Sequence, residues 1–324
     1  MNGTATALAH PNIALSKYWG KREGEGNVPA VPSLSVTLAG LSTTTRVTFD
    51  DALGADTFVL GGAPASGEAL ARVTELLDRV REAAGISSRA SVVSTNDFPT
   101  ASGLASSASG FAALALAAVR AAGLDWSAER VADLARRSSA SAARSIFGGF
   151  VELDGAIARP VAPPDRLDLK VLVCVTTEAP KSVSSRDGMK RTAQHSPYYA
   201  AWLETAPRIH AELKEAVLAG DVARAGELAE RSALAMHASA LAAGVVYFSG
   251  ATLEALATVR ALREEGVVAY ATMDAGPHLK CLVRAGDAAR AAERLARTPG
   301  VLRIIEASAG EGARIVPSDG EGGG

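Results

Sequence analysis

The sequence lacks the features typical of secreted and membrane-spanning proteins. It has two cysteines, Cys174 and Cys281, and both lie in apolar stretches, which favours a reducing, cytoplasmic setting over a disulfide-stabilised fold. Residues Met1–Ala9 contain no basic segment followed by an apolar one, so we expect no signal peptide. No stretch of about 18 apolar residues is free of charge, so we expect no membrane helix and no membrane partner.

An excess of charge of one sign is also missing. The formal net charge is −2, whereas a general nucleic-acid-binding protein usually carries a basic excess, so we expect no nucleic-acid partner. Aromatic residues make up only 5% of the chain, but 48% hydrophobic and 21% charged residues are typical of a globular protein. A length of 324 residues fits two domains of ordinary size.

The order of the apolar patterns predicts an α+β protein with two domains. Short strands, one amphipathic helix and one Ala-rich helix alternate in the first half, whereas two long helices open the second half. The later strands and helices indicate a small antiparallel sheet with helices on one face. We place the N-terminal domain at residues 1–178 and the C-terminal domain at 179–324, with a disordered tail over 317–324. The main predicted helices cover 68–84, 106–122, 127–137, 196–219, 221–243, 249–266 and 287–297.

The segment Pro99–Gly110 combines two glycines, four serines and other small residues, and it joins a predicted strand to a helix N-terminus. Unpaired N–H groups and the helix dipole favour an anion there. The segment is not a Walker A loop, because no Gly-Lys-Ser/Thr closes it. The residues alone favour a phosphate-binding loop and a Ser-rich turn before a buried helix about equally.

Residues 99–108, Pro-Thr-Ala-Ser-Gly-Leu-Ala-Ser-Ser-Ala, resemble the phosphate-binding loop of the GHMP kinase superfamily, in the form found in diphosphomevalonate decarboxylases. Four other segments resemble the same family in the same order, so that the resemblance spans residues 12–277. They are Asn12–Lys21, Ser138–Ser145 with Gly148–Phe150, Lys181–Met189 and Asp274–Pro277. The resemblance implies a two-domain GHMP kinase fold. Its N-terminal domain would be a left-handed βαβ-type phosphate-binding domain, and its C-terminal domain a ferredoxin-like α/β layer.

This resemblance also implies a reaction, namely ATP-dependent decarboxylation of (R)-5-diphosphomevalonate to isopentenyl diphosphate by a homodimeric enzyme. ATP and Mg²⁺ would be the cofactors. No carboxylate cage for a metal can be recognised, so we expect phosphate oxygens and water to hold the ion. Two alternatives stay open. One is a related kinase or decarboxylase that acts on mevalonate or phosphomevalonate, and the other is a catalytically inactive nucleotide-binding regulator.

Three residues are the candidates for catalysis. Asp274 follows an apolar strand and precedes Gly-Pro, where it could accept or orient the proton of the substrate alcohol, although Asp is also common in such turns. Arg144 could grip the substrate carboxylate with its planar guanidinium, or could form a surface salt bridge. Lys17 is assigned to the carboxylate and phosphate end of the substrate by the resemblance.

The resemblance also assigns the binding residues. Those for the substrate are Tyr18, Lys21, Ser139, Ser141, Arg144, Ser185 and Arg186. Those for ATP are Pro99, Ser102, Gly103, Leu104, Ala105, Ser106, Ser107 and Lys181.

The sequence departs from the family pattern near some of these residues. Ser138 and Ala140 stand where the family usually has glycine, and His278 stands where it has Asn. A backbone that required positive φ at 138 or 140 would therefore be strained.

Overall fold

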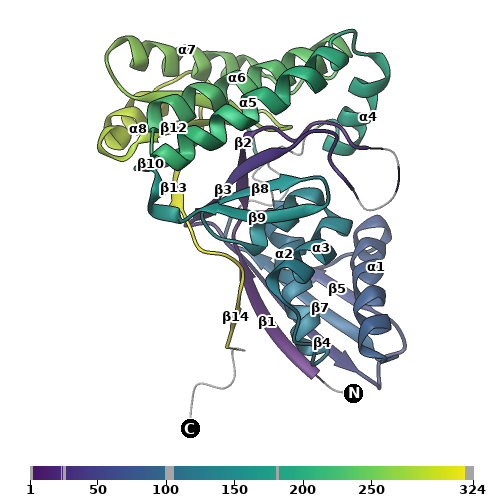
Figure 1. Ribbon diagram of the computed structural model, residues 1–324. Coiled ribbons are helices and arrows are strands. Elements are labelled where there is room, and N and C mark those ends of the chain that lie inside the picture. Colours follow the sequence, from purple (N-terminus) through teal and green to yellow (C-terminus); the bar gives the residue numbers. More distant parts are fainter. Residues whose placement is uncertain (1–2, 23, 25–26, 99–105, 180–181, 318–324) are drawn as a thin grey trace.

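The computed structural model describes residues 3–22, 24, 27–98, 106–179 and 182–317, and two β-sheets carry its fold (Figure 1). The strands are β1 (Gly3–Ala9), β2 (Asn12–Ser16), β3 (Ser33–Ala39), β4 (Thr43–Asp50), β5 (Thr57–Leu60), β6 (Ala63–Pro64), β7 (Arg89–Asn96), β8 (Phe150–Asp154), β9 (Ile157–Ala162), β10 (Leu169–Val175), β11 (Ala269–Met273), β12 (Leu279–Arg284), β13 (Arg303–Ala309) and β14 (Arg314–Val316). The helices are α1 (Gly67–Ala84), α2 (Ser106–Ala121), α3 (Ala128–Ser138), α4 (Ser185–His195), α5 (Tyr199–Ala219), α6 (Val222–Ala242), α7 (Gly250–Glu264) and α8 (Ala288–Ala296).

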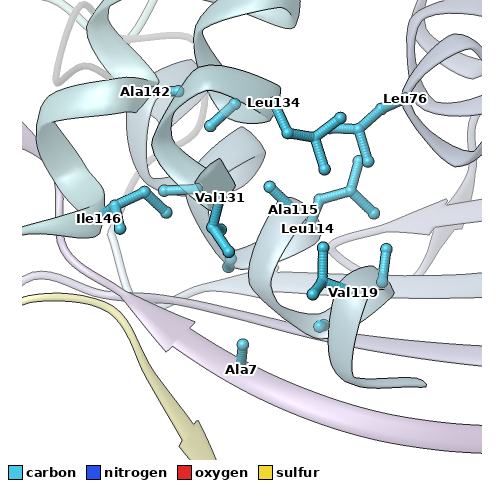
Figure 2. Packing of buried hydrophobic residues seen from close by; sticks show 14 of the residues in the cluster. Ala7, Leu76, Leu114, Ala115, Val119, Val131, Leu134, Ala142 and Ile146 are labelled. Carbon is cyan, nitrogen blue, oxygen red and sulfur yellow. The ribbon is translucent and has the colours of Figure 1, made fainter. Parts of the chain in front are cut away.

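The first sheet has the strand order β14-β1-β4-β7-β5-β6. Its pairs are antiparallel except β5 and β7, which are parallel and are connected through β6 and α1. Alternate residues of β4 are buried, as expected for a strand with one face on a core. Figure 2 shows that core, where Leu114, Ala115 and Val119 of α2 lie beside Val131 and Leu134 of α3. The alanines of α2 let this helix lie close to the sheet.

The second sheet has the order β11-β12-β10-β13-β3-β8-β9, with β2 paired to β3. Val171 and Val173 of β10 pack with residues of α5 and α6, whereas Leu172 and Cys174 pack with residues of α7 and α8. Helices thus cover both faces of the sheet, and our expectation of helices on one face is wrong. The physical reason is that successive side chains of β10 point to opposite faces and are apolar on both.

Two of the predicted helices begin at serine residues that cap them. The Ser127 side chain accepts a hydrogen bond from the Arg130 N–H at the start of α3, and Ser249 forms a capping box with Thr252 at the start of α7. Helix α4 was not expected from the sequence. Among the described residues, no helix is long and apolar enough to cross a membrane.

Both sheets contain strands from both halves of the chain. Strand β13 pairs with β3, and β14 pairs with β1, so the end of the chain returns to the N-terminal half. The division of the chain at residue 178 stays a prediction.

A buried polar network also joins the two halves. Glu152 of β8 accepts hydrogen bonds from His210 Nε2 at 2.9 Å and from Lys214 Nζ at 2.9 Å, both on α5. Because Nε2 faces a carboxylate, it carries the proton, and His210 Nδ1 accepts from the Ser16 hydroxyl at 2.9 Å. Ser16 ends β2, directly before Lys17, so the network fixes the backbone that leads into the predicted site.

We predict that Glu152→Gln lowers the free energy of unfolding by about 1–3 kcal/mol, because it weakens charge-assisted hydrogen bonds to a buried carboxylate. Lys214→Met removes only the half-exposed partner and should cost less than about 1 kcal/mol. Urea unfolding followed by circular dichroism measures both. Equal losses for the two variants would contradict a central role for Glu152.

Candidate active site

A pocket of about 620 Å³ lies between residues of the two halves of the chain. It brings together ten of the residues singled out from the sequence: Lys17, Tyr18, Lys21, Ser107, Ser139, Ser141, Arg144, Ser185, Arg186 and Asp274. Ser106 is the first residue of α2, next to Ser107. The predicted ATP-binding residues Pro99, Ser102, Gly103, Leu104, Ala105 and Lys181 lie outside the described residues.

At the floor of the pocket, Lys17 and Asp274 form an ion pair. Lys17 Nζ lies 2.7 Å from Asp274 Oδ1 and also donates to the Ala14 carbonyl at 2.7 Å. The Lys17 side chain is 2% exposed, whereas Asp274 keeps 25% of its side chain accessible from the pocket. Asp274 follows β11 on the turn before Gly276, as expected from its sequence context.

The charges around Asp274 set its protonation state. Burial alone would raise the pKa of Asp274, but the positive charges of Lys17 and Lys280 outweigh it and hold the pKa well below its usual range. Burial lowers the pKa of Lys17 to about 8, although Asp274 opposes that shift. Asp274 is therefore an anion at neutral pH, and a weak base.

Arg144 is buried at 2% exposure, and two neutral groups hold it in place. Its Nη1 donates to Ser33 Oγ at 2.7 Å, and its Nη2 donates to Asn12 Oδ1 at 3.4 Å. The Asn12 amide in turn donates to the Ser141 carbonyl at 2.9 Å. Arg144 Nε has no hydrogen-bond partner among the described residues. Burial lowers the pKa of Arg144 to about 10, so the guanidinium still carries its charge at neutral pH.

Ser139 and Ser141 face the same side of the pocket, with their hydroxyl oxygens 3.2 Å apart. Ser139 is extended, but Ser141 lies in a short 3₁₀ helix, Ala140–Ile146, so the shared face does not come from a strand. Asn27 is the single non-glycine residue with positive φ in the described part of the chain. Ser138 and Ala140 therefore fit this backbone without the strain that replacing glycine would otherwise cause.

The outer wall of the pocket is basic. Lys21 donates to Asn27 Oδ1 at 2.5 Å, and Arg186 lies 4.0 Å from the exposed Glu68. Arg72 of α1 also lines the pocket, and the sequence analysis missed it. Its Nη2 donates to the Ser138 carbonyl at 2.9 Å. No motif surrounds Arg72, and only the packing of α1 beside α3 brings it to the site.

The buried hydroxyl of Tyr18 has no hydrogen-bond partner among the described residues. Burial raises the pKa of this phenol, so Tyr18 stays protonated and can donate to an anion. Ser138 Oγ is likewise buried without a partner. Buried polar atoms are usually paired, so these orphaned groups fit a polar, anionic ligand. No group of three or more metal-binding side chains occurs among the residues that the structure describes.

Helix α4 carries Ser185 and Arg186 into the pocket and docks on an aromatic surface. The Ser184 carbonyl accepts a hydrogen bond from the Tyr247 hydroxyl at 3.2 Å. A Cβ added at Gly188 would lie 2.3 Å from that hydroxyl oxygen and 3.0 Å from Trp19 Cη2. Gly188 therefore allows α4 to lie directly against Trp19 and Tyr247.

These features define a class of protein. The fold has two sheets, and the pocket combines the N-terminus of α2 with a cluster of cations. This combination is typical of an enzyme that binds phosphorylated small molecules.

Comparisons with known proteins narrow the class to a family. Residues 9–157 match the diphosphomevalonate decarboxylase-like N-terminal domain, and residues 171–308 match the mevalonate 5-diphosphate decarboxylase C-terminal domain. The phosphomevalonate decarboxylase of Haloferax volcanii is 36% identical over 84% of this chain and 86% of its own. The diphosphomevalonate decarboxylase of Candida albicans is 32% identical over 85% of this chain and 83% of its own. This chain belongs to the diphosphomevalonate decarboxylase family.

Solved structures agree with that assignment. Mevalonate diphosphate decarboxylase from Staphylococcus aureus is 38% identical, with a TM-score of 0.93 over 98% of this chain and 99% of that one. A complex of MDDEF with MVAPP, AMPPCP and magnesium is 39% identical, with a TM-score of 0.91 over 98% of this chain and 100% of that one. The predicted fold class is confirmed.

We predict that Gly188→Ala raises KM for the phosphorylated substrate several-fold, because the new methyl group pushes α4 away from Trp19 and Tyr247. Gly250→Ala, at the start of α7, is the matched control, since no atom lies within 4 Å of its added Cβ. Steady-state kinetics on both variants test this. An unchanged KM in Gly188→Ala would mean that the position of α4 does not affect binding.

We also predict that kcat/KM falls as pH rises through about 8, because Lys17 is charged below its pKa and neutral above it. The charged and titratable groups around Lys17 are Asp274, Lys280, Arg144 and His237. Carbon-13 NMR of labelled lysines should show one side chain that titrates near pH 8. That resonance should be absent from Lys17→Arg, and a titrating signal that persisted there would belong to another residue.

Proposed function

We propose that this chain catalyses the ATP-dependent decarboxylation of (R)-5-diphosphomevalonate to isopentenyl diphosphate, with ADP, phosphate and CO2 as the other products. The observation that carries the proposal is the convergence of the Lys17–Asp274 pair and Arg144 at the floor of one basic pocket. A tertiary alcohol and its neighbouring carboxylate would meet an anionic acceptor and a fixed guanidinium there.

The first step is phosphorylation of the alcohol. The substrate hydroxyl, hydrogen-bonded to Asp274, attacks the γ-phosphorus of ATP while the bond to the ADP oxygen breaks, and the hydroxyl proton passes to an oxygen of the transferred phosphate. Because Asp274 is a weak base, its main contribution is to orient the hydroxyl oxygen of the substrate. Lys17 lies beside Asp274 and stabilises the negative charge of the transferring phosphoryl group. Ser106 and Ser107 at the start of α2 bind ATP phosphates together with the preceding loop and Lys181. Mg²⁺, when bound with ATP, neutralises phosphate charge.

The second step removes phosphate and CO2 together. The C–O bond to the new phosphate breaks, and the electron pair of the C–CO2 bond becomes the carbon–carbon double bond. A guanidinium that only attracted the carboxylate would stabilise the ground state, because the departing CO2 is neutral. Arg144 is held in place by hydrogen bonds to Ser33 and Asn12. It therefore fixes the orientation of the carboxylate, so that the electron pair of the C–CO2 bond can form the carbon–carbon double bond.

The substrate diphosphate is bound by the basic outer wall. Lys21, Arg72 and Arg186 supply cations, and Tyr18, Ser139, Ser141 and Ser185 supply hydroxyl groups. Charge-assisted hydrogen bonds from such groups are the strongest that a protein can offer a phosphate.

A second substrate is favoured by one observation. The relative from Haloferax volcanii that is 36% identical is a phosphomevalonate decarboxylase, so the 5-monophosphate is the alternative substrate. The number of cations on the outer wall favours the diphosphate, which carries more negative charge.

We further propose that the enzyme works in the cytoplasm as a homodimer, within the mevalonate pathway of isoprenoid synthesis. The buried free thiols of Cys174 and Cys281 suit a reducing compartment. A mass measurement in solution by light scattering checks the dimer.

The proposed reaction is tested by incubating the protein with ATP, Mg²⁺ and mevalonate, its 5-phosphate or its 5-diphosphate, and following ADP and CO2. We expect ADP and CO2 in equal amounts with the 5-diphosphate. ADP without CO2 would indicate a kinase, and products with the 5-phosphate alone would indicate the alternative substrate. No ADP with any of the three would contradict an enzyme.

Asp274→Asn is the matched variant for this assay. It keeps the shape of the side chain but removes the anion, so turnover should fall by about 100-fold or more. Binding of a non-hydrolysable ATP analogue, measured by calorimetry, should stay nearly unchanged. A loss of nucleotide binding would give Asp274 a structural role.

A further inference from the structure

Lys280 is a fully buried lysine beside Asp274, at the floor of the pocket, and the sequence analysis did not single it out. It lies in β12, opposite Thr272 of β11 and Val173 of β10, and its side chain is 0% exposed. Residues two apart in a strand share a face, so Lys280 lies on the side of Leu282, which packs with α5 and α6. Lysine is almost never fully buried without a partner.

Its Nζ lies 3.3 Å from Asp274 Oδ2, on the oxygen that Lys17 does not contact. Each carboxylate oxygen of Asp274 therefore has its own ammonium group. The two lysines come from distant parts of the sequence, the end of β2 and the middle of β12. Lys17 donates a hydrogen bond to Oδ1, whereas Lys280 faces Oδ2 through charge alone, since Oδ2 has no hydrogen-bond partner among the described residues. Positive charge at both oxygens favours one orientation of the carboxylate more strongly than a single ion pair would.

A purely structural purpose does not account for this arrangement. One cation suffices to pair one buried carboxylate, and a second adds the cost of removing an ammonium group from water. The two lysines also repel each other, since the charge of Lys280 lowers the pKa of Lys17. With the charge of Arg144 also acting on Asp274, three buried cations lie around one anion. Such an excess of positive charge suits a step in which negative charge gathers on a transferring phosphoryl group.

We propose that Lys280 is a positioning residue for the reaction. It acts through Asp274, holding the carboxylate ionised and fixed in the orientation that receives the substrate hydroxyl. The role rests on the proposed function, because it has a purpose only if an alcohol is phosphorylated beside Asp274. Lys280 itself touches Asp274 and not the reacting atoms.

The test is Lys280→Met, which keeps the length of the side chain and removes its charge. We expect kcat for CO2 release to fall at least about tenfold, while KM for ATP and for the phosphorylated substrate changes less than about threefold. Thermal unfolding should occur at the same temperature as in the wild type or higher, because a repelled buried charge is gone. A structural lysine would show the reverse, with lower stability and little change in kcat.

Lys170→Met is the matched control. Lys170 belongs to the same sheet, but its side chain is 34% exposed and pairs with Glu306 on the surface. This variant should keep the wild-type kcat.

A double-mutant cycle with Asp274→Asn tests whether Lys280 acts through Asp274. If it does, the double variant is no slower than Asp274→Asn alone, whereas independent effects would multiply and overturn the proposal. Lys280→Gln is measured in parallel, so that a misfolded Met variant still leaves a result. Full kcat in either folded variant would also overturn the role.

The wild type separates this proposal from the proposed function. No CO2 from the wild type with either phosphorylated substrate would overturn the function and this role together. CO2 from the wild type with an unchanged kcat in the Lys280 variants would overturn the role alone.

Discussion

The ion pair between Lys17 and Asp274 is the contact on which the site depends. It joins residues 257 positions apart, at the end of β2 and at the turn after β11. Because it is nearly buried, each charge would be costly without the other, so the two halves of the chain must close on each other for the site to exist. The network of Ser16, His210 and Glu152 supports the same junction from behind. The contacts that join the two halves of the chain therefore also form the pocket that receives the substrate.

The ends of the elements and the motif residues could be predicted from the sequence because their signals are local. Ser127 and Ser249 cap helices through contacts three residues away. The short segments that resemble the family carry their side chains to one place because a common fold arranges them. The second face of the C-terminal sheet could not be predicted in this way. A fully apolar strand such as β10 shows that both its faces are buried, but not which helices cover them.

The supporting residues of the site were missed for the same reason. Asn12 and Ser33 hold Arg144, Arg72 reaches the pocket from the side of α1, and Lys280 approaches Asp274 from a neighbouring strand. None of these contacts has a characteristic spacing in the sequence, because each joins segments that only tertiary packing brings together. The replacement of glycine at positions 138 and 140 is a related case. From the sequence, strain was expected if the backbone required positive φ there, but Ser138 and Ala140 do not have positive φ.

The pairing of β14 with β1 has a consequence for the synthesis of the protein. Residues 314–316 supply an edge strand of the sheet that residues 3–9 begin. A ribosome makes the chain from its first residue, so β1 leaves the exit tunnel long before its partner exists. Until then, one edge of the N-terminal sheet presents unpaired N–H and C=O groups to other chains. Completion of that sheet is therefore among the last events of folding in the cell. Until then, this edge is a site where chaperones could bind during translation.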